Sequence, residues 1–286
     1  MLRLIALPVA VLILIIAGHF WGGMESLEAT MVASIAIVIA GIPHGTLDVE
    51  IAAAHFGHKG IAIKAKIIAA YIGCAASMVL LWIILPELAL VAFLIISIVH
   101  FSRDWRGGVD PFLAMMVGWA LVALPALASP DDVAMIFTVL TGSPNGSVIA
   151  GLLGAASVPA TLGSLVFAYW ASRKRDPRSA MEVLACIAAA LFLPPLIAFA
   201  VFFCGLHSPR HMRDALQETG ALSYTKKALI IAVVSALSLG FGVALFLFQG
   251  NLSPDAGIIR SAFILISTLT VPHFILENIL SNKQQV

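Results

Sequence analysis

Five of the eight histidines lie within long apolar stretches of the chain or at their ends, beside other polar residues. They are His44, His100, His207, His211 and His273. Imidazole is the commonest metal ligand in proteins, and an ionisable group inside an apolar segment is costly to keep without a purpose. These five side chains are therefore the first candidates for the chemistry of this protein.

Three of these histidines are followed four positions later by a carboxylate. The pairs are His44 with Asp48, His100 with Asp104, and His273 with Glu277. On an α-helix, residues four apart lie on one face, about 6 Å apart along the axis. Such a carboxylate could accept the second ring N–H of a metal-bound histidine and orient it, or it could bind the metal itself.

The remaining two histidines, His207 and His211, are also four residues apart, within the run His-Ser-Pro-Arg-His. Two imidazoles at this spacing on one helical face can bind one metal ion. Pro209 prevents an ordinary helix interior, so we expect Ser208 to cap a new helix that has Pro209 at its first position.

Each histidine also has a structural interpretation. His44 could belong to a helix-ending turn in which Asp48 caps the next helix, and His100 could pair with Asp104 at the membrane interface. His207 and His211 could contact lipid headgroups, and His273 could bond a neighbouring helix. The recurrence of the pattern favours a joint function over these separate roles, whereas His19, His55 and His58 are interpreted as interface or loop residues.

A site rich in histidine favours a transition metal, because magnesium and calcium prefer oxygen ligands. Sulfur ligands are scarce. Cys74, Cys186 and Cys204 all lie in apolar stretches, and no two of them have the spacing typical of a metal site. Non-haem Fe(II) is a reasonable expectation, although the spacing alone does not separate iron from zinc.

The composition identifies the surroundings of these residues as a membrane. Of the 286 residues, 61% are hydrophobic and only 11% are charged, against roughly 25% charged residues in soluble domains. A soluble fold could not bury this much apolar surface, and disorder needs the opposite composition. The net charge of +1 gives no sign of a nucleic-acid partner. We therefore expect an all-α, polytopic transmembrane bundle that forms a single integral-membrane domain over residues 1–286.

A bilayer span needs about 20 mostly apolar residues, and the chain offers about eight to nine. The segment 131–142 is apolar but short, so it could be re-entrant, interfacial or a broken span. The predicted spans are residues 4–20, 29–42, 67–85, 88–101, 111–128, 148–171, 181–206, 228–249 and 258–280.

Basic residues accumulate on the cytoplasmic side of membrane proteins. We expect a multi-pass protein of the inner, cytoplasmic membrane. Residues 19–21, His-Phe-Trp, stand where a signal-peptide cleavage site would need small residues, so we expect the first span to be retained. The rule on basic residues predicts a cytoplasmic N-terminus. It fails once, because residues 173–178 and 210–227 are both basic yet flank a single predicted span. Either the segment 131–142 completes a crossing, or Pro194 and Pro195 break the seventh span into half-helices.

Four motifs together resemble the Brp/Blh family of bacterial and archaeal membrane-embedded β-carotene 15,15′-dioxygenases, which supply retinal to rhodopsins. The likeness covers residues 41–277, with the motifs in matching order. They are Gly-Ile-Pro-His-Gly-Thr-Leu-Asp at 41–48, His100-Phe101 with Asp104, Phe-Phe-Cys-Gly-Leu-His-Ser-Pro-Arg-His at 202–211, and Pro272-His273.

The resemblance implies non-haem iron held by His44, His100, His207 and His211, with His273 as a less certain ligand. It implies cleavage of the central double bond of β-carotene by O₂ to give two all-trans-retinal. Asp48, Asp104 and Glu277 would then orient the ligands. The partners would be a carotenoid taken from the lipid membrane and, for the product, a rhodopsin.

An apolar carotenoid could enter sideways from the bilayer, and a tunnel would hold the middle of its polyene at the metal. Candidate tunnel walls are Phe93, Phe101, Trp105, Trp119, Phe202, Phe203 and Phe274. The alternatives are cleavage of another carotenoid, a di-iron desaturase, a b-haem carrier, and a transporter or carotenoid-binding scaffold. A desaturase would need more paired histidines than this chain has.

Overall fold

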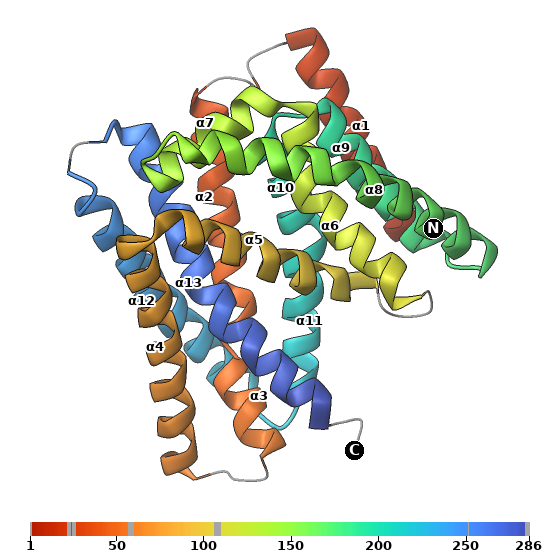
Figure 1. Ribbon diagram of the computed structural model, residues 1–286. Coiled ribbons are helices and arrows are strands. Elements are labelled where there is room, and N and C mark those ends of the chain that lie inside the picture. Colours follow the sequence, from red (N-terminus) through yellow and green to blue (C-terminus); the bar gives the residue numbers. More distant parts are fainter. Residues whose placement is uncertain are drawn as a thin grey trace.

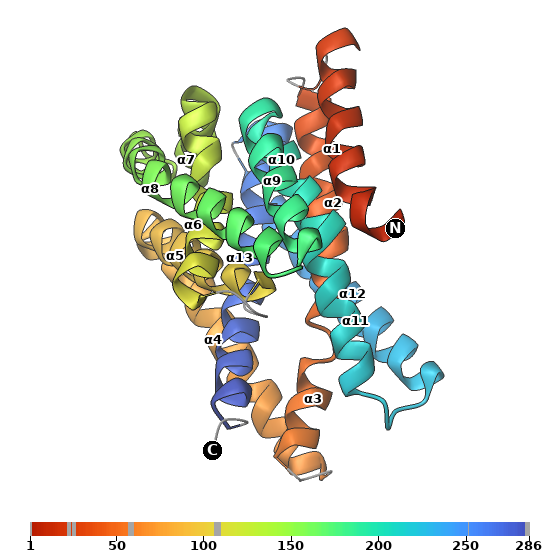
Figure 2. The ribbon, with the colours of Figure 1, turned by 90° about the vertical axis from the view of Figure 1, so that its right-hand side faces the viewer.

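The computed structural model describes residues 2–21, 24, 27–56, 60–105, 110–250 and 252–283 (Figures 1 and 2). Every regular element among them is a helix, as the composition predicts. His58, interpreted above as an interface or loop residue, lies outside this part of the chain. The helices are α1 (Leu2–Trp21), α2 (Leu27–His44), α3 (Asp48–His55), α4 (Ile61–Ile84), α5 (Pro86–Ser102), the 3-10 turn η1 (Arg103–Trp105), α6 (Pro111–Ala128), α7 (Pro130–Thr141), α8 (Asn145–Arg173), α9 (Pro177–Phe192), α10 (Pro195–Phe202), the π-helical turn η2 (Phe203–His207), α11 (Ser208–Glu218), α12 (Tyr224–Leu247) and α13 (Pro254–Lys283).

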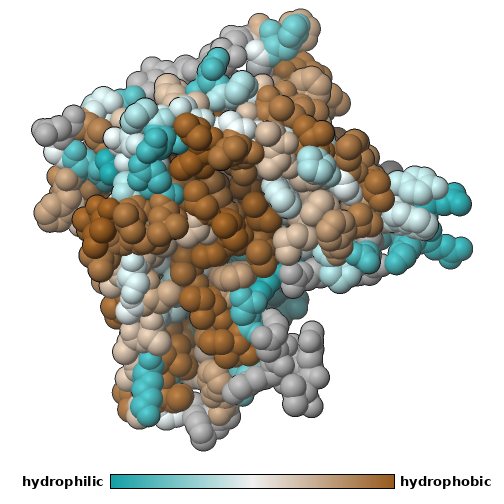
Figure 3. Space-filling view, viewed as in Figure 1, coloured by the Kyte–Doolittle hydropathy of each residue, from teal (hydrophilic) through white to brown (hydrophobic). Residues whose placement is uncertain are grey.

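Within the described residues, seven helical segments are long and apolar enough to cross a membrane, and Ala6–Phe20 in α1 is a shorter apolar helix. The polytopic bundle is thus confirmed, with somewhat fewer full-length spans than the sequence predicted. Large apolar side chains cover much of the surface (Figure 3). Helices α4 and α12 are the least buried of these segments, because only 11% and 6% of their most apolar stretches are buried inside the protein. Their outward faces therefore suit contact with lipid.

The predicted span 181–206 is broken. Helix α9 ends at Phe192, Leu193 and Pro194 are extended, and α10 begins at Pro195. Two consecutive prolines explain the break, since each lacks a backbone donor and disfavours a helical residue before it. The segment 131–142 forms the short helix α7, which packs against α8. The break at Pro194 and Pro195, one of the two alternatives considered for the topology, is therefore present.

Helices α5 and α6 cross very closely at Gly118. A Cβ atom on this residue would lie 2.3 Å from the carbonyl oxygen of Ile98 and 2.8 Å from the amide nitrogen of Ser102. Small residues at such crossings let helix backbones approach in membrane proteins. The crossing fixes the last turn of α5, which carries His100.

Helix ends bring the histidine-bearing segments together. His44 is the last residue of α2, His100 lies in the last turn of α5, and His207 ends the π-helical turn. Helix α13 runs past these ends and contributes His273. In Figures 1 and 2 the lower part of the molecule holds α3, α11, the first turns of α4 and the C-terminus, whereas α7 lies at the upper end.

Replacing Gly118 by alanine should destabilise the protein by about 1–3 kcal/mol, the usual cost of overpacking a filled contact. The added methyl must push α5 and α6 apart, because it meets backbone atoms that cannot rotate away. The thermal unfolding midpoint of purified protein in detergent measures the effect. Gly151→Ala is the matched control, since its Cβ would meet nothing within 4 Å. Equal midpoints for the two variants would contradict the close crossing.

Candidate metal centre

The five histidines singled out in the sequence form one cluster. The rings in contact have centroids between 4.3 Å apart, for His207 and His211, and 5.9 Å apart, for His44 and His211. His100 and His207 are almost completely buried. His19 lies apart in α1, where its ring contacts Phe20, so the five are a selected group rather than all the histidines of the chain.

His207 and His100 point their Nε2 atoms at each other, 3.1 Å apart. His207 Nδ1–H donates to Asp104 Oδ2 over 2.9 Å, and His100 Nδ1 lies 3.1 Å from Glu277 Oε2. A carboxylate only accepts, so Asp104 keeps a proton on His207 Nδ1 and leaves its Nε2 with a lone pair. Two nitrogens bound at right angles to one ion, each at about 2.1 Å, would be about 3 Å apart.

His273 repeats this arrangement from another helix. Its Nδ1–H donates to Asp48 Oδ2 over 2.7 Å, and the hydroxyl of Tyr71 donates to the same oxygen over 3.2 Å. The Nε2 of His273 and the Nδ1 of His44 are buried and have no hydrogen-bond partner among the described residues. Both nitrogens are thus available to a ligand, which an imidazole buried only for packing would not require.

His211 has carboxylates near both ring nitrogens. Its Nδ1 is 3.3 Å from Glu277 Oε1, and its Nε2 is 3.6 Å from Asp104 Oδ1. Glu277 also lies 3.3 Å from His273 Nε2 and accepts from Arg103 over 3.0 Å. The Glu277 carboxylate is therefore the most connected group of the cluster.

The predicted pairing of histidine and carboxylate within one helix is not what the structure shows for the first two pairs. Asp48 bonds His273 instead of His44, because α2 ends at His44 and residues 45–47 form a turn. Asp104 bonds His207 instead of His100, because the 3-10 turn η1 replaces the α-helix after Ser102. The carboxylates therefore connect different elements.

The expected capping role of Ser208 is wrong. Its hydroxyl donates to the carbonyl of Ala40 in α2, and the N-cap position of α11 is His207. Pro209 is the second residue of α11, one position later than predicted. The π-helical turn before it leaves His207 and His211 adjacent, with ring centroids 4.3 Å apart.

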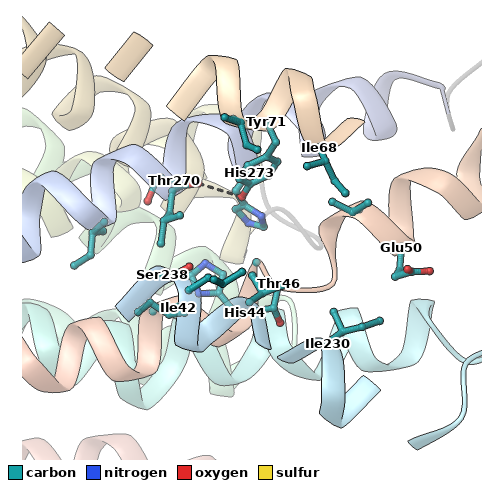
Figure 4. A pocket seen from close by; sticks show the side chains of 18 of the residues that line it. Ile42, His44, Thr46, Glu50, Ile68, Tyr71, Ile230, Ser238, Thr270 and His273 are labelled. Carbon is teal, nitrogen blue, oxygen red and sulfur yellow. Dashed lines mark hydrogen bonds between the residues drawn. The ribbon is translucent and has the colours of Figure 1, made fainter. Parts of the chain in front are cut away.

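An apolar cavity of about 430 Å³ reaches the cluster at His44 and His273 (Figure 4). Aliphatic side chains of α4 and α12 form much of its wall, including Ile68, Ile230 and Val234. Figure 4 shows the two rings facing each other between Ile42, Ser238 and Thr270 at one end and Glu50, Ile68 and Ile230 at the other. The histidines therefore lie midway along the cavity.

Of the predicted aromatic walls, Phe203 lines this cavity, and Gly41 lets it approach. A Cβ on Gly41 would come within 2.9 Å of the Phe203 ring. Phe93 and Phe101 line a smaller cavity of about 80 Å³. The remaining candidates pack elsewhere near the cluster: Phe202 stacks on Trp105, Phe274 lies beside the guanidinium of Arg103, and Trp119 lines none of the described cavities.

Two residues of the site were not singled out from the sequence. Tyr71 donates to Asp48 and to the carbonyl of Leu269, and Arg103 holds Glu277. A phenol within a predicted span was the available signal for Tyr71. Its partner Asp48 is 23 residues away, so spacing could not reveal the contact.

The donor atoms suit a transition-metal ion. Three groups in the described part of the chain each offer one atom per residue within 4.8 Å of the others. They are His44, His100 and His207; His100, His273 and Glu277; and Asp104, His207 and His211. Mostly imidazole donors with carboxylates beside them match iron, zinc, copper or nickel better than magnesium or calcium.

Comparison with known proteins gives one consistent result. A family model described as "Beta-carotene 15,15′-dioxygenase" matches residues 35–281. A curated protein named "Beta-carotene 15,15′-dioxygenase", from uncultured marine bacterium 66A03, is 31% identical over 250 residues, which is 84% of this chain and 90% of that protein. No solved structure matches the chain.

Asp48→Asn should weaken binding of a divalent metal by about tenfold to hundredfold, the usual effect of losing a carboxylate that orients a histidine ligand. The amide can still fill the space but no longer fixes the proton on His273 Nδ1. Titration of chelator-treated protein with Co²⁺, followed by its visible absorption, measures the affinity. Asp132→Asn, an exposed change in α7, is the control. Unchanged affinity in Asp48→Asn would contradict an orienting role.

Proposed function

The chain belongs to the beta-carotene 15,15′-dioxygenase family and is an enzyme, and we propose that it cleaves β-carotene at the central double bond. One β-carotene and one O₂ give two all-trans-retinal, so both oxygen atoms end in the aldehydes. The observation that carries this proposal is the position of His44 and His273 halfway along an apolar cavity. Such a position suits cleavage at the middle of a long apolar substrate.

We further propose that the metal is non-haem Fe(II). His44, His100, His207 and His211 would hold it, and the buried Nε2 of His273 is available as a fifth ligand. An iron ion bound there would supply the redox chemistry that allows O₂ to react with the polyene. Asp48, Asp104 and Glu277 keep the imidazole rings oriented by accepting their N–H groups.

The protein itself contributes to the reaction by positioning the substrate and by keeping water away from it. The cavity wall is mostly aliphatic, with a few hydroxyl side chains such as Thr46 and Tyr71 near the histidines. Such a wall limits the access of water and holds the polyene in register with the metal. Several lining residues are also exposed on the outer surface of α4 and α12, among them Ile72 at 63% and Leu237 at 70%. The cavity is therefore open on the face suited to lipid, and we propose that the carotenoid enters between these helices.

We propose the inner membrane as the location and the lower end of Figure 1 as its cytoplasmic side. Lys64, Lys66 and the basic residues of α11 and early α12 lie there, as the positive-inside rule requires. We also propose a cytoplasmic N-terminus, on the basis of the distribution of basic residues along the sequence. The retinal would leave through the bilayer to an acceptor such as a rhodopsin.

Alanine at His44, His100, His207 or His211 should reduce retinal formation to about 1% of wild type or less, because loss of a ligand disables the metal-dependent step. Each variant is expressed in a bacterial host that accumulates β-carotene, and retinal is quantified by chromatography with protein level checked by blot. His19→Ala in α1 should behave as wild type. Carotene that persists beside well-expressed wild-type protein would overturn the substrate assignment, and hydroxylated carotenoids would be tested next.

Val234→Trp should lower retinal formation at least about tenfold by filling the cavity and displacing the polyene from the metal. Val233→Trp is the matched control on the same helix, since Val233 is 49% exposed and does not line the cavity. Metal content, measured on both purified variants, should equal that of wild type. Equal activity of the two variants would place the substrate elsewhere.

A further inference from the structure

A second cavity, of about 350 Å³, also reaches the histidine cluster, and most of its lining residues differ from those of the apolar cavity. His44 and His273 line both cavities, so their rings form the partition between them. The wall of the second cavity comes from α3, α11, η1 and the last turns of α13. Of these elements, α3, α11 and the last turns of α13 lie in the lower part of the molecule in Figures 1 and 2.

Carboxylates dominate this second cavity. Asp48, Asp104, Asp214, Glu218 and Glu277 all line it. Two arginines line it as well, but each is engaged. Arg103 donates to Glu277 over 3.0 Å, and the Arg210 guanidinium donates to Glu182, a buried residue of α9 outside the cavity. The lining is therefore acidic overall, and we refer to it as the acidic cavity.

The acidic groups of this cavity extend from the protein surface to the buried histidines, and one face of α11 carries the outer ones. His211, Asp214 and Glu218 follow one another at spacings of three and four residues, which places them on one stripe of the helix. Asp214 and Glu218 are exposed, whereas Asp48 is buried and the side chain of Asp104 is only 3% exposed. The deep end is formed by His44 and His273, which are nine-tenths or more buried and carry the two ring nitrogens without hydrogen-bond partners.

The apolar cavity offers few oxygen or nitrogen atoms to a metal ion, and its carboxylate, Glu50, is paired with Lys64 over 2.6 Å. A hydrated divalent cation is therefore disfavoured there, because stripping its water without new oxygen or nitrogen contacts is very costly. A metal site buried in a membrane protein still needs an entry path. A cleft lined by negative charge with low-dielectric walls concentrates cations. The acidic cavity has this character from the exposed end of α11 down to the imidazoles.

We propose that the acidic cavity is the path by which the divalent metal ion enters the histidine cluster, with Asp214 and Glu218 as its outer cation-attracting groups. This inference rests on the proposed metal centre. The proposal assigns a different ligand to each of the two cavities. Metal and water reach it through the acidic cavity, and carotenoid reaches it through the apolar one.

The test is the rate of metal uptake by intact, chelator-treated protein in detergent, with Co²⁺ as the probe and its visible absorption followed by stopped flow. The double variant Asp214→Asn, Glu218→Gln should load about fivefold more slowly at low ionic strength. Its final cobalt content should equal that of wild type. Added salt should slow the wild type towards the variant, because the attraction is screened.

The matched control is Asp131→Asn, Asp132→Asn, which removes two exposed charges from α7 at the other end of the molecule. Its loading rate should stay within about twofold of wild type, since exposed charges more than a Debye length away are largely screened. Equal loading rates in the α11 variant and wild type would overturn the path while leaving the metal centre intact. A lower final cobalt content in the α11 variant would also overturn it, by making these carboxylates part of the binding site. Failure of wild type to take up cobalt would overturn the metal centre itself.

Discussion

The contact between a carboxylate of one element and an imidazole of another is the interaction on which the rest of the structure depends. Asp104 in η1 holds His207 in the π-helical turn, Asp48 in α3 holds His273 in α13, and Glu277 in α13 lies against His100 in α5. Each of these groups would be very costly to bury alone. Because the carboxylates and imidazoles pair with each other, they hold together helix ends that come from distant parts of the chain.

Irregular backbone is concentrated where this polar network lies. α2 stops at His44, α5 gives way to a 3-10 turn, and a π-helical turn precedes α11. In apolar surroundings, backbone of this kind is tolerated only where it is buried in protein or lines a cavity. The same departures from α-helix allow ring nitrogens to converge, since side chains on uninterrupted parallel helices would project at fixed intervals.

The sequence alone was enough to predict the helical membrane fold and the residues that meet in the cluster, because hydropathy and polar residues in apolar segments are local signals. It offered the break at Pro194 only as one of two alternatives. It was not enough to predict which carboxylate serves which histidine. The i, i+4 rule assumes a continuous helix, and that assumption fails after His44 and again after Ser102. The contact of Tyr71 with Asp48 and the aliphatic cavity walls from α4 and α12 arise from long-range packing. The spacing of residues in the sequence does not reveal such packing.

Helix α12 has a particular consequence for how this enzyme can diversify. It contributes Ile230, Val234 and Leu237 to the apolar cavity, yet its residues Tyr224–Leu247 include no histidine and no carboxylate. Changes there can reshape the space offered to a substrate without touching the polar network. Selection for a new carotenoid can therefore act on one lipid-facing helix while the reactive centre stays constant, which separates the evolution of specificity from that of chemistry.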